Sequence, residues 1–324
     1  MLNLYNIYNG FKDQFDLWVI TPAAIQHFVP EDKFFKAVVS IGFNDAMNCY
    51  SFQPLLNDIK GRYKSFDFVT LDTYSRYAGR KALLDFFPFL NNSVPPAKKN
   101  VTFYYRSDYF RTWGGSKQNK LIISFFETLK LYFHQVEFIV LGDKDDFKFP
   151  AFITDKRTNA FGRDVDLAYN EIFAQSHLVI GLIGSNMLQP SMFCDFTVHL
   201  VPRSKTSIVA EEIFNVDGPA IQHWFNNIYL FGNEDLSDVS PTDLVEKVVV
   251  FYMTYLAKCY KKEIFGDSNF KKGLSQQEFI KREYPFFNYK VAASLKARIT
   301  DESFRYNLWR YRIFRLLKKL KVYR

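Results

Sequence analysis

The stretch that decides the fold is His177-Leu-Val-Ile-Gly-Leu-Ile-Gly-Ser-Asn-Met-Leu-Gln-Pro-Ser191. Residues 177–183 are almost without polar side chains, which is typical of a strand that is buried on both faces of a sheet. Gly184-Ser185-Asn186 ends this strand, and we expect a helix to begin at once with Ser185 or Asn186 as its cap. A buried strand that leads directly into a helix predicts a parallel α/β sheet.

The same alternation of strand and helix continues on both sides of this stretch. Apolar runs and helical spacing predict strands over 101–105, 136–141, 196–201 and 228–231, and helices over 116–133 and 166–176, from 186 and from 240. At the start of the last helix, Ser240 is a cap and Pro241 takes the first helical position. The predicted fold class is therefore α/β, with residues 100–265 forming a doubly wound parallel sheet covered on both faces.

A predicted linker divides the chain. Residues 91–100 (NNSVPPAKKN) combine two prolines with polar side chains. The segment before them contains predicted strands over 17–20, 37–41 and 66–71 and a predicted helix over 80–87, which we interpret as a smaller α/β lobe. The predicted domains are a small N-terminal lobe (1–97), a C-terminal lobe (98–290) and a basic tail (291–324).

Composition excludes several classes of protein. The chain has 324 residues, of which 48% are hydrophobic and 23% charged, so it can bury a large core and is not mainly disordered. Its three cysteines, Cys49, Cys194 and Cys259, lack the spacing of a disulfide scaffold or a zinc cage, which favours a reducing compartment. We find no run long enough to span a membrane and no signal peptide, so the protein is expected to stay in the cytoplasm.

Common catalytic motifs are also missing from the sequence. It contains no GxxxxGK[ST] loop, no GxGxxG fingerprint, no HExxH pair and no GxSxG elbow. These absences argue against ATP hydrolysis, NAD binding, zinc proteolysis and serine hydrolysis. The acidic run over 143–146 could be compared with magnesium-binding acids, but its position within the second lobe speaks against a metal site.

The turn after the apolar strand suits a diphosphate. The free N–H groups and the positive dipole end of the expected helix face the carboxyl end of the strand, where open α/β sheets bind ligands. We therefore name Gly184, Ser185, Asn186 and Met187 as candidate anion-binding residues. The alternative is a capped turn that serves only the fold.

Residues 168–202 (AYNEIFAQSHLVIGLIGSNMLQPSMFCDFTVHLVP) resemble the C-terminal nucleotide-sugar lobe of GT-B glycosyltransferases. In that family a strand, a G-S-x-M-L-x-P-S turn and a second strand ending in Pro frame the donor diphosphate. The resemblance covers about residues 100–235 and is strongest to bacterial surface-polysaccharide transferases of the O-antigen and capsule type. It implies two Rossmann-like lobes and metal-independent transfer from a nucleotide-sugar donor, without a further cofactor. Ile183 stands where several members of the family have His.

The same lobe offers further candidates for donor binding. Arg106 and Arg111 follow its first strand, where the family often places a cation, and a guanidinium binds phosphate oxygens bidentately. Gly142 and Asp143 end the next strand and are candidates to contact the base or the ribose, and Glu211 is a candidate ribose-binding acid. The alternatives are a charged surface loop, a Gly-Asp turn and a solvated helix face.

The catalytic base is expected from the N-terminal lobe, on the acceptor side. Asp45 follows a predicted strand and is the first candidate, with His27 and Asp72 as rivals. A base must lie within hydrogen-bond reach of the acceptor hydroxyl. Because no spacing selects among these three residues, a structural role is the alternative for each.

The basic charge of the chain lies in its last residues. Residues 296–324 hold ten Lys and Arg against two acids, a surplus equal to the net charge of the whole chain, +8. On a helix, Trp309, Ile313 and Leu320 would share one face, opposite the basic side chains. Such a helix is typical of a segment in an anionic membrane interface. The alternatives are packing on the protein's own lobe and contact with nucleic acid, and the latter fits poorly because the rest of the chain is neutral.

These observations favour a glycosyltransferase that moves a sugar from a nucleotide-sugar donor to a surface-polysaccharide or lipid-linked glycan acceptor. It would be peripheral at the inner face of the membrane, bound to anionic lipids through residues 300–324, and would not bind nucleic acid. The alternative is a non-catalytic, membrane-tethered protein of the same fold that binds a nucleotide or a glycan.

Deletion of residues 300–324 is expected to abolish binding to anionic vesicles, because each cation near such a surface contributes about 1 kcal/mol. Cosedimentation with vesicles containing phosphatidylglycerol measures this, and vesicles of phosphatidylcholine alone are the control. If the shortened chain binds as tightly as the full chain, the membrane assignment is wrong.

Overall fold

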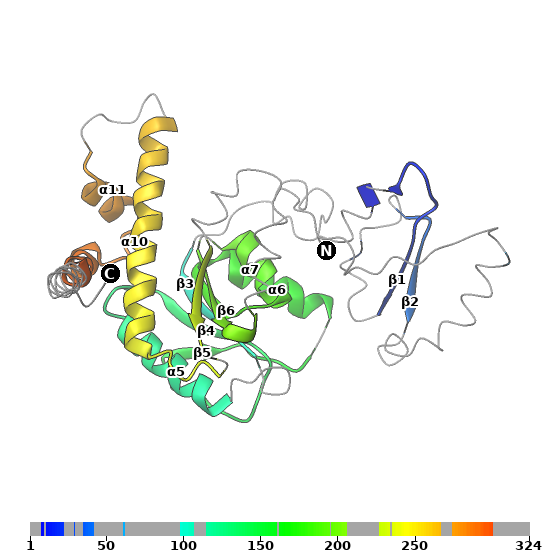
Figure 1. Ribbon diagram of the computed structural model, residues 1–324, viewed down its shortest axis with the longest axis horizontal. Coiled ribbons are helices and arrows are strands. Elements are labelled where there is room, and N and C mark those ends of the chain that lie inside the picture. The colour runs from blue at the N-terminus through cyan, green and yellow to red at the C-terminus, as the bar shows by residue number, and fades with distance from the viewer. Residues whose placement is uncertain are drawn as a thin grey trace, which may run out of the picture. The chain divides into compact units, whose positions relative to one another are not determined.

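The computed structural model describes part of the chain in detail (Figure 1). The described residues are 8–9, 11–22, 29, 35–41, 61, 98–106, 115–160, 162–194, 196–205, 227–233, 235–266 and 274–300. Contacts along the chain define two compact units, one made of residues 1–114 and 138–236 and the other of residues 115–137 and 237–324. Each unit is described by itself.

A six-stranded parallel sheet forms the centre of the first unit. Its strands are β3 (Asn100–Tyr105), β4 (Glu137–Gly142), β5 (Ile153–Asp155), β6 (Ser176–Leu182), β7 (Thr197–Pro202) and β8 (Asn227–Gly232). Their spatial order is β5-β4-β3-β6-β7-β8. Counted from β3 this is 3-2-1-4-5-6, the order of the Rossmann fold. The predicted α/β class with a parallel sheet is confirmed.

The strand β5 is the one element of the sheet that the sequence did not predict. It has three residues, Ile153 to Asp155, and only Ile153 is a buried apolar residue. A segment this short shows no alternation and no apolar run. It pairs with β4 at the edge of the sheet, so its position there depends on a neighbour rather than on its own pattern.

Later strands are added to the sheet on opposite sides of β3. The chain first adds β4 and β5 on one side of β3, and then α6 (Arg163–Ala174) leads to β6 on the other side. β3 and β6 run parallel, with Tyr104 opposite Gly181. After β6 come the 3₁₀ turn η6 (Ser185–Met187) and the short helix α7 (Leu188–Phe193), and a second turn, η7 (Arg203–Lys205), follows β7. The carboxyl ends of β3 and β6 therefore lie side by side at a topological switch point.

Two helices cover one face of this sheet. Ile139 and Leu141 of β4 and Val179 of β6 pack in one apolar cluster with Phe173 of α6 and Met187 of η6. α6 and α7 contact each other and lie together beside the sheet (Figure 1). The helix α6 runs from the end of β5 back to the start of β6. The first turn of α6 therefore lies at the edge of the sheet where the strands end.

The second unit is helical. It contains α5 (Gly115–Leu129), α10 (Pro241–Gly266), α11 (Gln276–Glu283) and a helix over 289–300. Phe133, Tyr252 and Phe287 form an aromatic cluster with ring centroids 5.1–5.3 Å apart. Ser240 accepts a hydrogen bond from the N–H of Asp243, which confirms the predicted cap of α10. Among the described residues, no helix is long and apolar enough to cross a bilayer.

The described part of the N-terminal segment contains a small parallel pair, β1 (Trp18–Pro22) and β2 (Ala37–Ile41). Both strands were predicted. The predicted strand over 66–71 and the predicted helix over 80–87 lie outside the described residues, as do most of the linker and residues 301–324. The boundaries predicted for the small lobe and the tail therefore remain predictions.

Gly142 meets a steric limit at the carboxyl end of β4. Its φ of +110° is in the region that side chains rarely adopt, and a Cβ added there would lie 1.9 Å from the carbonyl oxygen of Tyr105. Gly162, which precedes α6, has a similar φ of +140° but nothing within 4 Å of its added Cβ. A side chain at Gly142 would therefore cause both backbone strain and steric overlap, whereas a side chain at Gly162 would cause backbone strain alone.

Gly142→Ala is expected to destabilise the protein by about 3 kcal/mol or more, because it adds overlap between β3 and β4 to the backbone strain. Gly162→Ala is the matched control and should cost only the strain, about 1–2 kcal/mol. Urea unfolding at neutral pH measures both. Equal losses for the two variants would contradict the close approach of β3 and β4.

Candidate functional site

The candidate site is the edge of the sheet where β3 and β6 end. Arg106 follows β3 directly and is half-buried. The turn that begins at Gly184 follows β6, the neighbour of β3. The structure therefore brings two groups of predicted site residues, distant in sequence, to the point where open α/β sheets bind their ligands.

The turn after β6 differs from the predicted one. α7 begins after a 3₁₀ turn, its N-cap is Met187, and no side chain caps it, so the prediction that Ser185 or Asn186 caps the helix is wrong. The physical reason is that the Met187 N–H donates to the Gly184 carbonyl, 2.9 Å away, which closes the turn before the helix starts. The side chain of Met187 is fully buried. The backbone of Met187 thus closes the turn, and its side chain packs in the core.

The amides of Ser185 and Asn186 come at the start of this turn, where N–H groups have no acceptor within the helix. Gly184 precedes them with a φ of +154°. Asn186 is half-buried, and its side-chain nitrogen has no hydrogen-bond partner. This edge of the sheet can therefore offer N–H donors, although the turn contributes fewer of them than predicted.

Tyr104 is a candidate site residue that the sequence did not indicate. It lies on β3, two residues before Arg106, so both side chains project from the same face of the sheet. Its ring packs edge-on against Tyr169, with centroids 6.1 Å apart, and at a tilt against Phe173, with centroids 5.6 Å apart. In the sequence it belongs to an apolar run, VTFYY, and gives no signal beyond that of a core residue.

The surroundings of Tyr104 contain several charged groups. Burial raises the pKa of the Tyr104 hydroxyl far above its ordinary value, and the Tyr169 hydroxyl acts in the same direction. The guanidinium of Arg106 acts on it in the lowering direction, and the carboxylates of Asp143 and Asp166 in the raising direction. These groups come from β3, the end of β4 and the first turn of α6, so three elements contribute polar side chains to one region.

The predicted pair Gly142 and Asp143 lies at the carboxyl end of β4, beside β3. The Gly142 N–H donates to the hydroxyl of Tyr169 at 3.2 Å, and this hydroxyl in turn donates to the carbonyl of Lys156 at 3.1 Å. This N–H already has an acceptor, and the half-buried carboxylate of Asp143 follows it in the turn.

An ion-pair network holds the loop between β4 and β5. Arg157, whose side chain is fully buried, binds Asp145 at 2.6 Å and Asp155 at 2.9 Å. Its guanidinium also lies over the rings of Tyr105, at 4.9 Å, and Phe149, at 4.6 Å. The hydroxyl of Tyr105 donates to Asp145. Of the acidic run 143–146, Asp145 is engaged in these internal bonds.

The network also sets the charge of its acids. Burial raises the pKa of Asp145 and of Asp155, but the hydrogen bonds that they accept, above all from Tyr105 and Arg157, more than offset burial and hold both pKa values below normal. In the part of the chain that the structure describes, no group of three or more His, Cys, Asp or Glu could hold a metal.

A buried histidine lies on β7, away from this edge of the sheet. His199 is buried, stacks on Tyr229 with centroids 4.7 Å apart, and lies 3.4 Å from the side-chain oxygen of Asn227. The remaining candidates lie outside the described residues: Asp45, His27, Asp72, Arg111 and Glu211.

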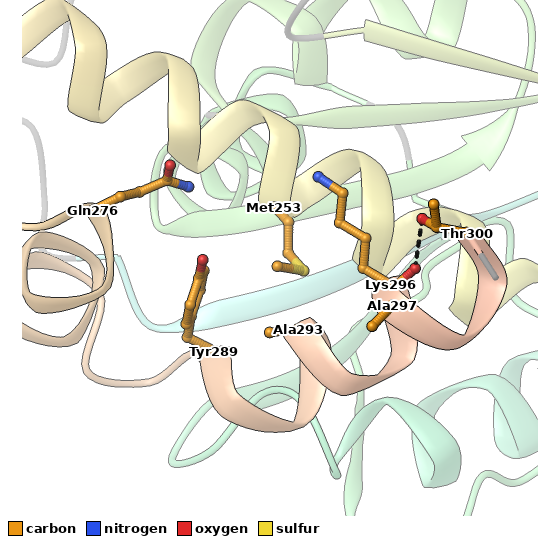
Figure 2. A pocket seen from close by; sticks show the side chains of 7 residues that line it. All are labelled: Met253, Gln276, Tyr289, Ala293, Lys296, Ala297 and Thr300. Atoms are coloured by element: carbon orange, nitrogen blue, oxygen red, sulfur yellow. Dashed lines mark hydrogen bonds between the residues drawn. The ribbon is translucent and has the colours of Figure 1, made fainter.

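A hollow within the second unit contains none of the residues predicted for donor binding or catalysis. It has a volume of about 690 Å³ and lies between α10, α11 and the helix over 289–300. Figure 2 shows Met253, Tyr289 and Lys296 among its lining residues and the bond from the Thr300 hydroxyl to the Lys296 carbonyl. It is open to solvent and offers one cation beside apolar side chains.

Comparison with protein-family models, with curated proteins and with solved structures finds no match for this chain.

Arg157→Met is expected to destabilise the protein by about 3 kcal/mol, because it leaves two partly buried carboxylates without their cation. Arg163→Met is the control, since Arg163 is exposed. Because the folded pKa values of Asp145 and Asp155 lie below 3.8, the stability from this network is present above that pH and is lost as the pH falls further. Urea unfolding between pH 7 and 3 should therefore show a smaller loss on acidification in Arg157→Met than in the control, and parallel curves would contradict this.

Proposed function

We propose that this chain binds a nucleotide-sugar at the switch point between β3 and β6 and transfers the sugar, as a two-lobed glycosyltransferase of the GT-B type. The observation that carries the proposal is the position of Arg106 at the end of the central strand of a Rossmann-ordered sheet. A crevice at this point is where such sheets bind nucleotides.

The chemistry of the crevice supports a diphosphate ligand. The guanidinium of Arg106 can form two parallel hydrogen bonds to phosphate oxygens. The amides of Ser185 and Asn186 come from the neighbouring strand's turn. A cation and oriented N–H groups stabilise the charge that develops on a leaving nucleoside diphosphate, which is what a metal-independent transferase requires.

The acceptor side of the proposal depends on the sequence. The N-terminal segment would supply the acceptor site, with Asp45 or His27 as the base that takes the proton from the acceptor hydroxyl. The basic residues of the last 24 positions would hold the protein on an anionic membrane, at its inner face. A glycan on a lipid carrier, or a growing surface polysaccharide, is then the acceptor that this location favours.

Arg106→Gln is expected to weaken binding of a nucleoside diphosphate at least tenfold, because hydrogen bonds to a charged group contribute about 1.5–3 kcal/mol. Isothermal titration with UDP, GDP, ADP, CDP and dTDP measures this, and Arg163→Gln serves as the control for a lost surface arginine. Unchanged binding by Arg106→Gln would contradict the proposed phosphate contact.

The same titrations test the function. If the wild-type chain binds none of the five nucleotides, it is not a transferase of this kind. If it binds one of them but neither hydrolyses nor transfers from the corresponding nucleotide-sugar, the non-catalytic binding protein is the better description.

A further inference from the structure

Tyr104 on β3 and Asp166 in the first turn of α6 form a second polar group at the carboxyl edge of the sheet, beside the predicted phosphate contact Arg106. We propose that these two residues, together with Asp143, bind the hydroxyl groups of a sugar ring in the ligand, either the ribose of the nucleotide or the sugar that it carries. The inference rests on the proposed function, because it assigns a part of the nucleotide-sugar to a part of the same site.

The position of the Tyr104 ring is restricted by its neighbours. Tyr169 and Phe173 of α6 pack against it. A Cβ added to Gly142 would lie 3.1 Å from the ring of Tyr104, and a Cβ added to Gly181 would lie 3.1 Å from the Cβ of Tyr104. The flanking strands therefore leave little free space around Tyr104. The hydroxyl has no hydrogen-bond partner within the described part of the chain. A ring held in this way presents its hydroxyl in one direction without loss of further side-chain entropy on binding.

Asp166 comes to the same place through the helical repeat. It precedes Tyr169 by three residues and Phe173 by seven, so the three side chains share one face of α6. Since Tyr169 and Phe173 contact the ring of Tyr104, Asp166 lies one turn nearer the carboxyl edge of the sheet. Its charge acts on the Tyr104 hydroxyl, as does that of Asp143.

Donors and acceptors in this group match a hydroxyl rather than a phosphate. The phenol of Tyr104 stays neutral at physiological pH and donates, whereas the two carboxylates accept. A sugar hydroxyl can accept from the phenol and donate to a carboxylate at the same time. Two carboxylates against the single charge of Arg106 disfavour a phosphate here. The uncharged sugar ring is therefore the part of the ligand that suits this position.

The test compares ligands with and without a sugar ring. Tyr104→Phe and Asp166→Asn should each weaken binding of the preferred nucleoside diphosphate, or of its nucleotide-sugar, about fivefold or more and leave the affinity for inorganic pyrophosphate within about twofold. Arg106→Gln should weaken both. Tyr169→Phe is the matched control, since its hydroxyl bonds only the protein, and it should lower stability more than affinity.

Comparison of three ligands distinguishes the ribose from the transferred sugar as the source of the hydroxyl groups. A loss of affinity seen with UDP, but not with 2′-deoxy-UDP, assigns the group to the ribose, and a loss seen only with UDP-glucose assigns it to the transferred sugar. If the nucleotide preferred in the titrations is not UDP, the corresponding ligands of that nucleotide are used.

Two results would overturn the inference. If Tyr104→Phe and Asp166→Asn both bind nucleotides and nucleotide-sugars like the wild type, the group has no role in binding, while the proposed function stands. If both variants lose pyrophosphate binding to the same extent as nucleotide binding, the residues support the site as a whole and do not recognise a sugar. Absence of any binding by the wild-type chain is a different pattern, and it overturns the proposed function together with the inference. Because Asp166→Asn leaves the ring of Tyr104 in place, one variant remains informative if the other does not fold.

Discussion

The structure of the sheet depends on the pairing of β3 with its two neighbours. β3 is the central strand, and it is shared by the two halves of the sheet. Close approach on both sides requires glycine: Gly142 lets the end of β4 pass beside the Tyr105 carbonyl, and Gly181 leaves room for the Met187 sulfur, which would lie 2.5 Å from a Cβ at that position. Because the chain adds strands first on one side of β3 and then on the other, the carboxyl end of β3 is the switch point at which open α/β sheets bind ligands.

Two neighbouring tyrosines of β3, Tyr104 and Tyr105, have hydroxyl groups in different surroundings. Tyr104 and Tyr105 project to opposite faces because side chains alternate along a strand. The Tyr105 hydroxyl donates to Asp145 within the closed network of Arg157, whose hydrogen bonds are satisfied by the protein. The charges of Arg106, Asp143 and Asp166 act on the pKa of the Tyr104 hydroxyl, and this hydroxyl makes no such hydrogen bond among the described residues. Tyr105 therefore stabilises a loop, whereas Tyr104 is the residue that we propose for ligand binding.

Prediction from the sequence succeeded where a local pattern carried the information. The apolar runs over 101–105 and 177–183 specified buried strands, and Ser240 with Pro241 specified the start of α10. It failed where the outcome depended on a contact with a distant segment. β5 is a strand because it pairs with β4, and the cap predicted at Ser185 or Asn186 was replaced by a bond within the turn. For Asp166, the sequence predicted only the start of a helix over 166–176.

By itself, the sequence determined the class of the fold and the identity of the buried strands, because burial on both faces demands a continuous apolar run. It also determined the position of the basic charge, which follows from composition alone. Only the tertiary structure decided that β3 lies between β4 and β6, and so that Arg106, Tyr104, Asp143 and Asp166 gather at one edge. The physical reason is that an apolar run records how deeply a strand is buried but not which strand lies beside it, and a site at the ends of strands depends on that neighbour.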